Sequence, residues 1–212
     1  MNTPSEKIAT PDHEVLDVFA ERWSPRAFAD RPVEPETLRR IFEAARWTMS
    51  SYNEQPWRYV VATKDDTEAY DRLLGCLNEF NQQWAQTAPV LMLSFAKKTF
   101  SRDGSPNRCS LHDVGAASAA LTFQATDLGL YVHQMAGIHR SLAEDTYNVP
   151  DDFEAMAGLA LGYLGSPDQL PDDMQAGETA PRSRKPLSEV VFADDWETPA
   201  SWVDDDANGD AV

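Results

Sequence analysis

The chain has 212 residues, of which 42% are hydrophobic and 10% are aromatic, so it can bury a sizeable core and is too apolar to be disordered. Its formal net charge is −17. A surface this acidic repels phosphate backbones and anionic lipids, so we expect neither nucleic acid nor a membrane surface as a partner.

No targeting or membrane-spanning segment is visible in the sequence. The first residues are polar, and the longest apolar runs, residues 89–96 and 155–164, are far shorter than the ~18 residues that span a bilayer. Without a secretory signal, Cys76 and Cys109 are expected to be reduced thiols. We therefore expect a soluble protein of the cytoplasm.

Hydrophobic periodicity predicts helices and strands interspersed along the chain. A first helix is expected at residues 15–19 with Asp12 as its N-cap, and a second begins at Pro35. The other predicted elements are a strand at 57–63, a helix at 66–84, a strand at 89–96, a helix at 112–128, a strand at 130–135, a helix at 140–147 and a strand at 155–164. Residues 97–108 read as a loop, and the chain after Gly165 is rich in Pro, Asp and Ser. This order lacks strict βαβ alternation, so it predicts a single α+β domain with a mostly antiparallel or mixed sheet.

Several well-known site signatures are absent from the sequence. There is no G-x-G-x-x-G after a strand, no P-loop, no H-E-x-x-H, no C-x-x-C and no G-x-S-x-G. A Rossmann dinucleotide site, a zinc site and a serine hydrolase elbow are therefore not supported, and no metal ligands are expected.

A polar connector, residues 50–57, lies between the predicted helix that ends near Trp47 and the strand that begins at Trp57. Its donors and acceptors are Ser50, Ser51, Asn53 and Gln55. Asn and Gln can match a uracil-like ring edge, which alternates carbonyl and N–H groups. The alternative is a helix C-cap with turn-forming residues, although such a cap has no need of a Gln before Pro56 and Trp57.

An arginine segment, residues 22–26, carries Arg22, Ser24 and Arg26 at alternate positions. An extended backbone would direct all three side chains to one side. Two guanidinium groups and a hydroxyl suit phosphate oxygens, because Arg presents paired donors in a fixed fork. The alternative, which the sequence favours equally, is a helix C-terminus whose last carbonyl groups attract cations. The two segments together suggest a site for a polar aromatic ring with an anionic tail.

A basic cluster, Arg182-Ser183-Arg184-Lys185, stands in a C-terminal region otherwise rich in Asp and Glu. It suggests an anionic partner, and the alternative is a salt-bridged strip of surface. Beyond it, residues 193–212 contain seven acidic residues and no Lys or Arg. We therefore expect a domain of residues 1–192 and an acidic tail of residues 193–212.

Short segments between about residue 12 and residue 192 occur in a specific order and spacing. They are Arg22-Trp23-Ser24-Pro25-Arg26-Ala27-Phe28, Pro32-Val33, Glu43-Ala44-Ala45-Arg46-Trp47, residues 50–58, Asp113-Val114-Gly115, Gly129-Leu130, residues 133–137, residues 162–165 and residues 184–187. In this order they resemble the nitroreductase family of FMN-dependent oxidoreductases. The resemblance implies an intertwined homodimer with FMN at the subunit interface and NAD(P)H as the electron donor.

The resemblance also implies a set of cofactor-binding residues. They are Arg22, Trp23, Ser24, Arg26, Ser50, Ser51, Asn53, Gln55, Met135, Ala136, Gly137, Arg182 and Arg184. By matching position, the phosphate is held by Arg22, Ser24 and one of Arg182 and Arg184, and Arg26 lies near flavin N1 and O2. The connector residues come from the other subunit. Residues 135–137 pack beside the ring, with backbone N–H near flavin N5.

The implied reaction is a ping-pong transfer of hydride from NAD(P)H through flavin N5 to a nitroaromatic, a quinone or a conjugated carbonyl. No protein group is assigned a catalytic role. Tyr52, Phe100 and Arg108 are the candidate substrate contacts, with Phe80 and Trp84 as further candidates, although core packing is the commoner role of an aromatic side chain. Residues 97–108 could form a lid with a hinge at Gly104.

Two alternatives to this function stay open. One is a family member with divergent flavin chemistry, such as reductive dehalogenation or flavin fragmentation, and the other is a non-catalytic binding protein that acts through its acidic tail. The chain departs from the family pattern at Met49, where Pro is frequent, at Tyr52, which is bulkier than usual, and at Ile138, where Phe is common. These departures bear on the shape of the substrate pocket.

Overall fold

The computed structural model describes residues 3–203 of the chain. These residues form two compact units, which divide between Ala180 and Pro181. The predicted division at residue 192 concerns a domain and an acidic tail, and it stays a prediction.

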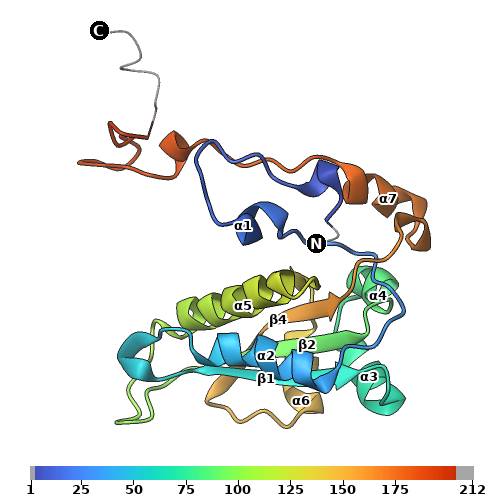
Figure 1. Ribbon diagram of the computed structural model, residues 1–212. Helices are drawn as coiled ribbons and strands as arrows, with labels where there is room; N and C mark the ends of the chain where they lie inside the picture. Colours follow the sequence, from blue (N-terminus) through green and yellow to red (C-terminus); the bar gives the residue numbers. More distant parts are fainter. Residues whose placement is uncertain (1–2, 204–212) are drawn as a thin grey trace, which may run out of the picture. The chain divides into compact units, whose positions relative to one another are not determined.

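An antiparallel sheet forms the centre of the first unit (Figure 1). Its strands are β1 (Trp57–Thr63), β2 (Val90–Lys97), β3 (Tyr131–Met135) and β4 (Phe153–Gly162), in the spatial order β1-β2-β4-β3. Each neighbouring pair is antiparallel. The α+β class and the mostly antiparallel sheet predicted from the sequence are confirmed, and all four strands begin and end within two residues of the predicted positions.

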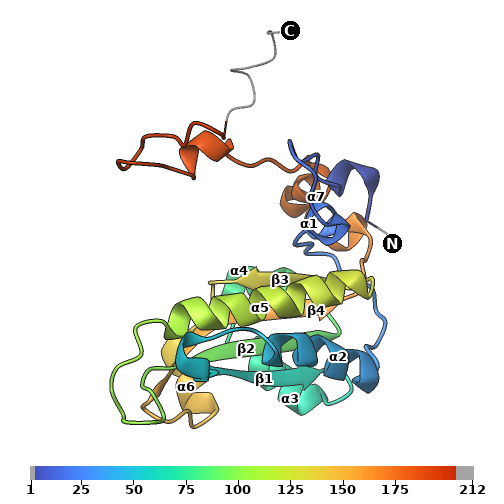
Figure 2. The ribbon, with the colours of Figure 1, turned by 60° about the vertical axis from the view of Figure 1, so that its left-hand side comes forward.

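Helices cover both faces of the sheet, so β2 is buried on both sides (Figure 2). One face carries α2 (Pro35–Arg46) and α5 (Ser110–Asp127), which share a core with Val90 and Met92 of β2. The other carries α3 (Thr67–Leu74), α4 (Glu79–Ala85) and α6 (Arg140–Thr146), which share a core with Leu91 and Leu93. The alternation of β2 side chains thus separates two cores.

The single helix predicted for residues 66–84 is wrong, because the structure divides it into α3 and α4. Asn78 begins the second helix by accepting a hydrogen bond from the backbone N–H of Asn81 at 2.9 Å. The chain between the two helices bonds elsewhere, since Leu77 bridges to Ile138 and the Asn78 N–H donates to the carbonyl of Gly137 at 3.0 Å. Side-chain capping and a distant backbone partner therefore override a continuous helical pattern.

Two further helices of the first unit differ from expectation. The helix α1 (Asp17–Glu21) has Leu16 at its N-cap, so the predicted cap at Asp12 is wrong. The helix α7 (Asp172–Thr179) lies in the region after Gly165, for which no element was predicted. It starts after Pro171 with Asp172 and Asp173 in its first turn, where acids complement the helix dipole.

The described part of the second unit is short. It contains a 3-10 turn at Leu187–Glu189 and a bridge between Phe192 and Pro199. The rings of Phe192 and Trp196 lie 5.3 Å apart, so residues in the predicted acidic tail have structure of their own. Among the residues described in the two units, no helix is long and apolar enough to cross a membrane.

Candidate functional site

The arginine segment follows α1 outside any helix, and its burial alternates along the chain. Trp23 and Pro25 are buried, whereas Ser24 is exposed and the flanking arginines are partly exposed. The Arg22 Nη1 donates to Ser24 Oγ at 3.3 Å. Arg22 is also the C-cap residue of α1, and its backbone N–H donates to the carbonyl of Val18. The outer side of the segment therefore carries the Ser24 hydroxyl and the exposed parts of Arg22 and Arg26.

Trp23 occupies the inner side of the same segment. Its ring is 5% exposed and lies edge-on to Tyr131 with the ring centroids 6.2 Å apart. The ammonium of Lys7 lies 4.7 Å from the centroid of the Trp23 ring. A ligand on the outer side would thus meet the backbone of this residue and not its indole.

Three side chains, of which Glu178 is buried and Thr87 and His133 are partly buried, hold the backbone of the arginine segment. Both carboxylate oxygens of Glu178 accept from the Arg26 N–H at 3.1 Å, and one accepts from the Ala27 N–H at 3.4 Å. Thr87 Oγ1 lies 3.3 Å from the carbonyl oxygen of Arg26. The Nδ1 of His133 lies 2.9 Å from the carbonyl oxygen of Pro25. The segment is therefore preorganised in the absence of any ligand.

Sequence analysis missed Glu178 and His133 as parts of the site. Glu178 is 4% exposed and belongs to α7, whose C-terminal carbonyl groups at 177 and 180 accept from Lys7 Nζ at 2.7 Å. No local pattern marks either residue, because their partners lie more than a hundred positions away in the sequence.

The guanidinium of Arg26 has an unused donor. Its Nε is buried and has no hydrogen-bond partner among the described residues. A buried N–H without a partner costs stability, so a native protein keeps one where a ligand or an unseen group completes it. This donor is the chemistry that a carbonyl or phosphate oxygen of a bound cofactor would satisfy.

The turn at residues 135–137 follows β3. The carbonyl of Gly137 accepts from the backbone N–H of Asn78 and from Asn81 Nδ2, both at 3.0 Å. A Cβ atom at Gly137 would overlap both asparagine amides, so only glycine fits here. Ala136 is exposed at the top of the turn. Asn81 is thus a third residue that sequence analysis missed, although an Asn three positions after another Asn was a usable signal of an N-cap.

The polar connector is strongly bent between α2 and β1. Tyr52, Asn53 and Gln55 have left-handed φ angles of 52°, 56° and 52°. Such angles cost roughly 1 kcal/mol or more each in residues other than glycine, and they concentrate at functional sites. Asp113, in the first turn of α5, accepts from the Ser51 N–H at 3.0 Å, and Ser50 Oγ accepts from the Gln55 N–H at 3.0 Å.

The side chains of Ser51 and Asn53 are available to a ligand. Neither makes a hydrogen bond to another of the described residues, and both are at least partly exposed. Gln55 is less available, because its Nε2 donates to the Asn53 carbonyl at 3.1 Å. The strained backbone therefore presents a hydroxyl and an amide outward.

The loop 97–108 is anchored to the polar connector. Glu54 accepts from the Ser101 N–H at 2.9 Å, from Ser101 Oγ at 2.6 Å and from Lys97 Nζ at 3.2 Å. Burial alone would raise the pKa of Glu54, but these hydrogen bonds outweigh it and lower the pKa. The base of the predicted lid is therefore held by a charged carboxylate.

Two of the predicted substrate residues meet at this anchor. The rings of Tyr52 and Phe100 are perpendicular, with centroids 5.7 Å apart, and the Arg102 guanidinium lies 4.1 Å from the Tyr52 ring. Arg108 is exposed, and no contact brings it to them. Trp84 is fully buried in the core near His133, and Phe80 is exposed on α4. The structure thus joins Tyr52 to Phe100 and adds Arg102.

The arginine segment and the polar connector lie far apart within one chain. In the register of the sheet, His133, which contacts Pro25, is aligned with Leu91 of β2, whereas the first residue of β1 pairs with Ala96 of β2. Leu91 and Ala96 are five residues apart along β2, which corresponds to ~16 Å. The arginine segment packs by α4, and the connector is bonded to α5 on the opposite face (Figure 1).

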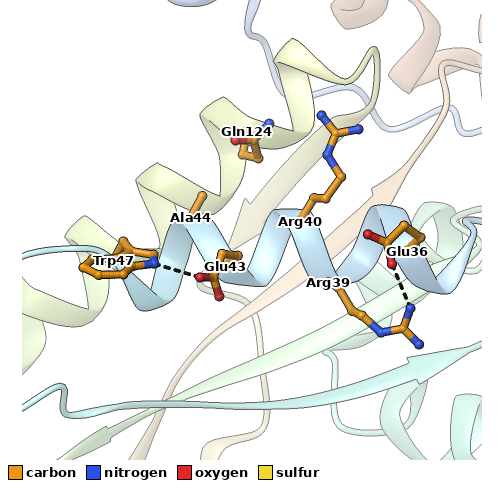
Figure 3. Close-up of a pocket in the computed structure, with 7 residues that line it drawn as sticks. All are labelled: Glu36, Arg39, Arg40, Glu43, Ala44, Trp47 and Gln124. Atoms are coloured by element: carbon orange, nitrogen blue, oxygen red, sulfur yellow. Dashed lines mark hydrogen bonds and ion pairs between the residues drawn. The ribbon is translucent and has the colours of Figure 1, made fainter.

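A hollow of about 530 Å³ lies on α2 and α5 (Figure 3). Its lining residues are Glu36, Arg39, Arg40, Glu43, Ala44, Trp47 and Gln124. Glu36 pairs with Arg39 at 2.9 Å, and Glu43 accepts from Trp47 Nε1 at 2.7 Å. The hollow contains none of the predicted site residues. It is also a poor site for an anionic cofactor, because two of its lining residues are acidic and Glu36 already pairs with Arg39.

Arg182 and Arg184 belong to the second compact unit. Arg184 Nη1 donates to the Ser183 carbonyl at 2.7 Å, and Lys185 pairs with Glu189 at 3.1 Å. Their predicted place beside the phosphate stays a prediction.

Comparisons with known proteins identify the family and the fold. A model described as the nitroreductase family matches residues 19–163. A solved oxidoreductase containing FMN is 39% identical, with a TM-score of 0.82, covering 86% of this chain and 93% of that chain. A nitroreductase family protein from Clostridium difficile 630 has the same fold, with a TM-score of 0.65 at 24% identity over 84% of this chain and 97% of that one.

Curated relatives match over shorter spans of this chain. An uncharacterised 15.4 kDa protein of Mycolicibacterium smegmatis is 34% identical over 62% of this chain and 87% of its own length. A putative NADH dehydrogenase/NAD(P)H nitroreductase of Streptomyces coelicolor is 36% identical over 35% of this chain and 36% of its own length. The second match thus spans about a third of that relative.

Proposed function

The chain belongs to the nitroreductase family, and from this premise we propose that it is an FMN-dependent NAD(P)H oxidoreductase that reduces electron-poor acceptors. The acceptors are nitroaromatics, quinones or conjugated carbonyls. The similarity to a solved oxidoreductase containing FMN and to a relative named as an NAD(P)H nitroreductase supports this assignment.

The observation that carries the proposal is the preorganised arginine segment with its unused donor. Arg22 and Ser24 present a cation and a hydroxyl on one side of an extended backbone, and Arg26 keeps a buried Nε without a partner among the described residues. These groups fit an FMN phosphate and the electron-rich N1 and O2 edge of its ring. Arg182 or Arg184 would complete the phosphate site.

Two backbone turns would flank the ring of a bound FMN. The glycine turn at residues 135–137 offers a surface without bulky side chains, so the backbone can approach a flat ring closely. The polar connector offers Ser51 and Asn53 as donors and acceptors for the ring edge. Ser50 and Gln55 have a different part, since their mutual hydrogen bond shapes the connector.

The site is built from two copies of the chain. A single copy holds the arginine segment and the connector on opposite faces of the sheet, so one cofactor meets both only if the connector comes from a partner. Large apolar side chains beside the connector support such a contact, because Trp47, Met49 and Tyr52 are 75%, 77% and 75% exposed. A homodimer would cover them.

The chemistry that FMN supplies when bound is acceptance of hydride from NAD(P)H and its donation to a second substrate, which makes the proposed cycle ping-pong. The chain binds and orients the reactants. Arg26 places a positive charge at the pyrimidine edge, and a charged hydrogen bond there contributes roughly 1.5–3 kcal/mol. Tyr52 and Phe100 line the approach to the ring, with Arg102 and, by prediction, Arg108 at its rim.

The test is reconstitution of the purified protein with FMN. Apo-protein titrated with FMN should quench flavin fluorescence at a ratio of one flavin per chain, and its mass in solution should be that of two chains. Anaerobic mixing with NADH or NADPH should bleach the flavin absorbance, and an added quinone should restore it. A protein that does not bind FMN would overturn the proposal.

A further inference from the structure

A partly buried histidine links the two parts of the proposed cofactor site that lie within one chain. The Nδ1 of His133 lies 2.9 Å from the carbonyl oxygen of Pro25. Because a carbonyl can only accept, the hydrogen of the neutral imidazole belongs on Nδ1. Pro25 stands between Ser24 and Arg26, so this bond sets the position of the backbone that carries both side chains.

The ring of His133 also packs against Trp84. The centroids of the two rings lie 4.4 Å apart, and the indole is fully buried. Trp84 Nε1 donates to Asn81 Oδ1 at 3.2 Å, and Asn81 Nδ2 donates to the carbonyl of Gly137 at 3.0 Å. Contacts thus run without a gap from Pro25 to Gly137.

The histidine is held neutral in this setting. The pKa of His133 is lowered to about 4, mainly by burial, with Arg26 and Arg22 acting in the same direction and backbone hydrogen bonding at Pro25 and Ser24 acting against them. A neutral ring adds no charge beside the arginine segment and keeps its single N–H for the Pro25 carbonyl. His133 therefore transfers no proton in the proposed reaction.

We propose that His133 is a positioning residue. Through Trp84 and Asn81, it fixes the position of the arginine segment relative to the Gly137 turn. The proposal rests on the proposed function, because the two parts matter together only if one cofactor spans them. The phosphate would depend on the Pro25 end of the chain of contacts and the flavin ring on the Gly137 end.

Two substitutions separate this role from simple core packing. His133→Phe keeps a ring against Trp84 and removes the N–H, whereas His133→Asn keeps a donor near the position of Nδ1 and removes the ring. Binding of FMN and of riboflavin, which lacks the phosphate, is measured on apo-protein by fluorescence titration, and thermal unfolding of each apo-variant checks the fold.

We expect His133→Phe to weaken FMN binding about tenfold, the effect of one lost hydrogen bond, and riboflavin binding by a smaller factor of about threefold, since riboflavin shares the ring edge that meets Arg26 but has no phosphate. His133→Asn should stay within about threefold of the original FMN affinity. An equal loss for both flavins, or an unchanged FMN affinity in His133→Phe, would overturn the proposal. Failure of the unsubstituted protein to bind either flavin would instead overturn the proposed function, and the positioning role with it.

The link to Gly137 is tested by adding Asn81→Asp, which still accepts from Trp84 but cannot donate to the Gly137 carbonyl. If the contacts act together, the double variant should bind FMN at least about threefold better than the product of the two single losses predicts. Losses that multiply within about 1.5-fold would overturn the link.

Discussion

Glu178 holds the backbone of Arg26, since both oxygens of its carboxylate accept the same N–H at 3.1 Å. The carboxylate is almost completely buried and is the only acidic group that bonds this backbone among the described residues. A helix near the end of the first unit thus shapes a segment near its start.

The substitution Glu178→Gln should loosen this contact. An amide nitrogen would face the Arg26 or Ala27 N–H without being able to accept, and a buried donor left unpaired costs about 1–3 kcal/mol. Urea denaturation should show that loss of unfolding free energy, and FMN affinity should fall with it. Glu36→Gln is the matched control, because Glu36 pairs with Arg39 at the surface and should contribute less than about 1 kcal/mol. Equal effects of the two variants would contradict the structural role of Glu178.

Arg22→Ala should weaken FMN binding and leave the apo-protein folded. Loss of a charged hydrogen bond to phosphate costs roughly 1.5–3 kcal/mol, which is about 10- to 100-fold in dissociation constant. Flavin fluorescence titration measures the affinity, and circular dichroism checks the fold. Arg39→Ala, on α2, removes a cation of the same kind from a hollow that holds no predicted site residue, and it should leave FMN affinity unchanged. An unchanged affinity in Arg22→Ala would show that the phosphate lies elsewhere.

Gly137→Ala should destabilise the protein, because its Cβ would overlap the amides of Asn78 and Asn81. Overpacking of this kind typically costs about 1–3 kcal/mol, which thermal unfolding of the apo-protein can measure. Gly75→Ala is the control, since a Cβ there would have contacts of 3.4 Å or more, and its effect should lie within about 0.5 kcal/mol. Similar unfolding temperatures for the two variants would mean that the asparagines move aside readily.

The parts of the molecule that were predictable from sequence are those with local causes. The strands 57–63 and 90–97 follow from their apolar runs, and the alternation of Arg22, Ser24 and Arg26 from an extended backbone. The division of residues 66–84 was not predictable from periodicity, because it depends on Asn78 bonding across to Gly137. His133 and Glu178 act on residues 108 and 152 positions away, and only the folded chain brings them there.

Tyr52→Gly should widen the approach to the ring. The side chain is 75% exposed and supports Phe100 and Arg102, and its φ of 52° is one that glycine adopts without strain. We expect kcat/KM for a bulky quinone to rise about tenfold, as relief of ~1.4 kcal/mol of steric cost would give, with little change for a small quinone. Tyr52→Phe keeps the ring and should leave both values unchanged. A parallel change for both quinones would assign Tyr52 to the fold of the connector and not to access.

The stability of the apo-protein should depend on His133 in mildly acidic solution. Its pKa is about 4 in the folded protein, against an ordinary value of 6.5, mainly because burial disfavours the charged ring. The unfolded chain therefore binds a proton at higher pH than the folded chain does. The contribution of the neutral His133 ring to the free energy of unfolding is therefore fully present above pH ~6.5. It is lost progressively as the pH falls toward ~4.

A downward shift of this size corresponds to roughly 3 kcal/mol at most. Urea denaturation at pH 7, 5.5 and 4.5 should show the unfolding free energy of the unsubstituted protein falling more steeply than that of His133→Phe, which has no proton to bind. Carboxylates such as Glu54, whose pKa is lowered, also destabilise the fold as they protonate, but they do so equally in both proteins and cancel in the difference. Parallel curves would mean that the ring of His133 is hydrated, and its place between Pro25 and Trp84 would then be wrong.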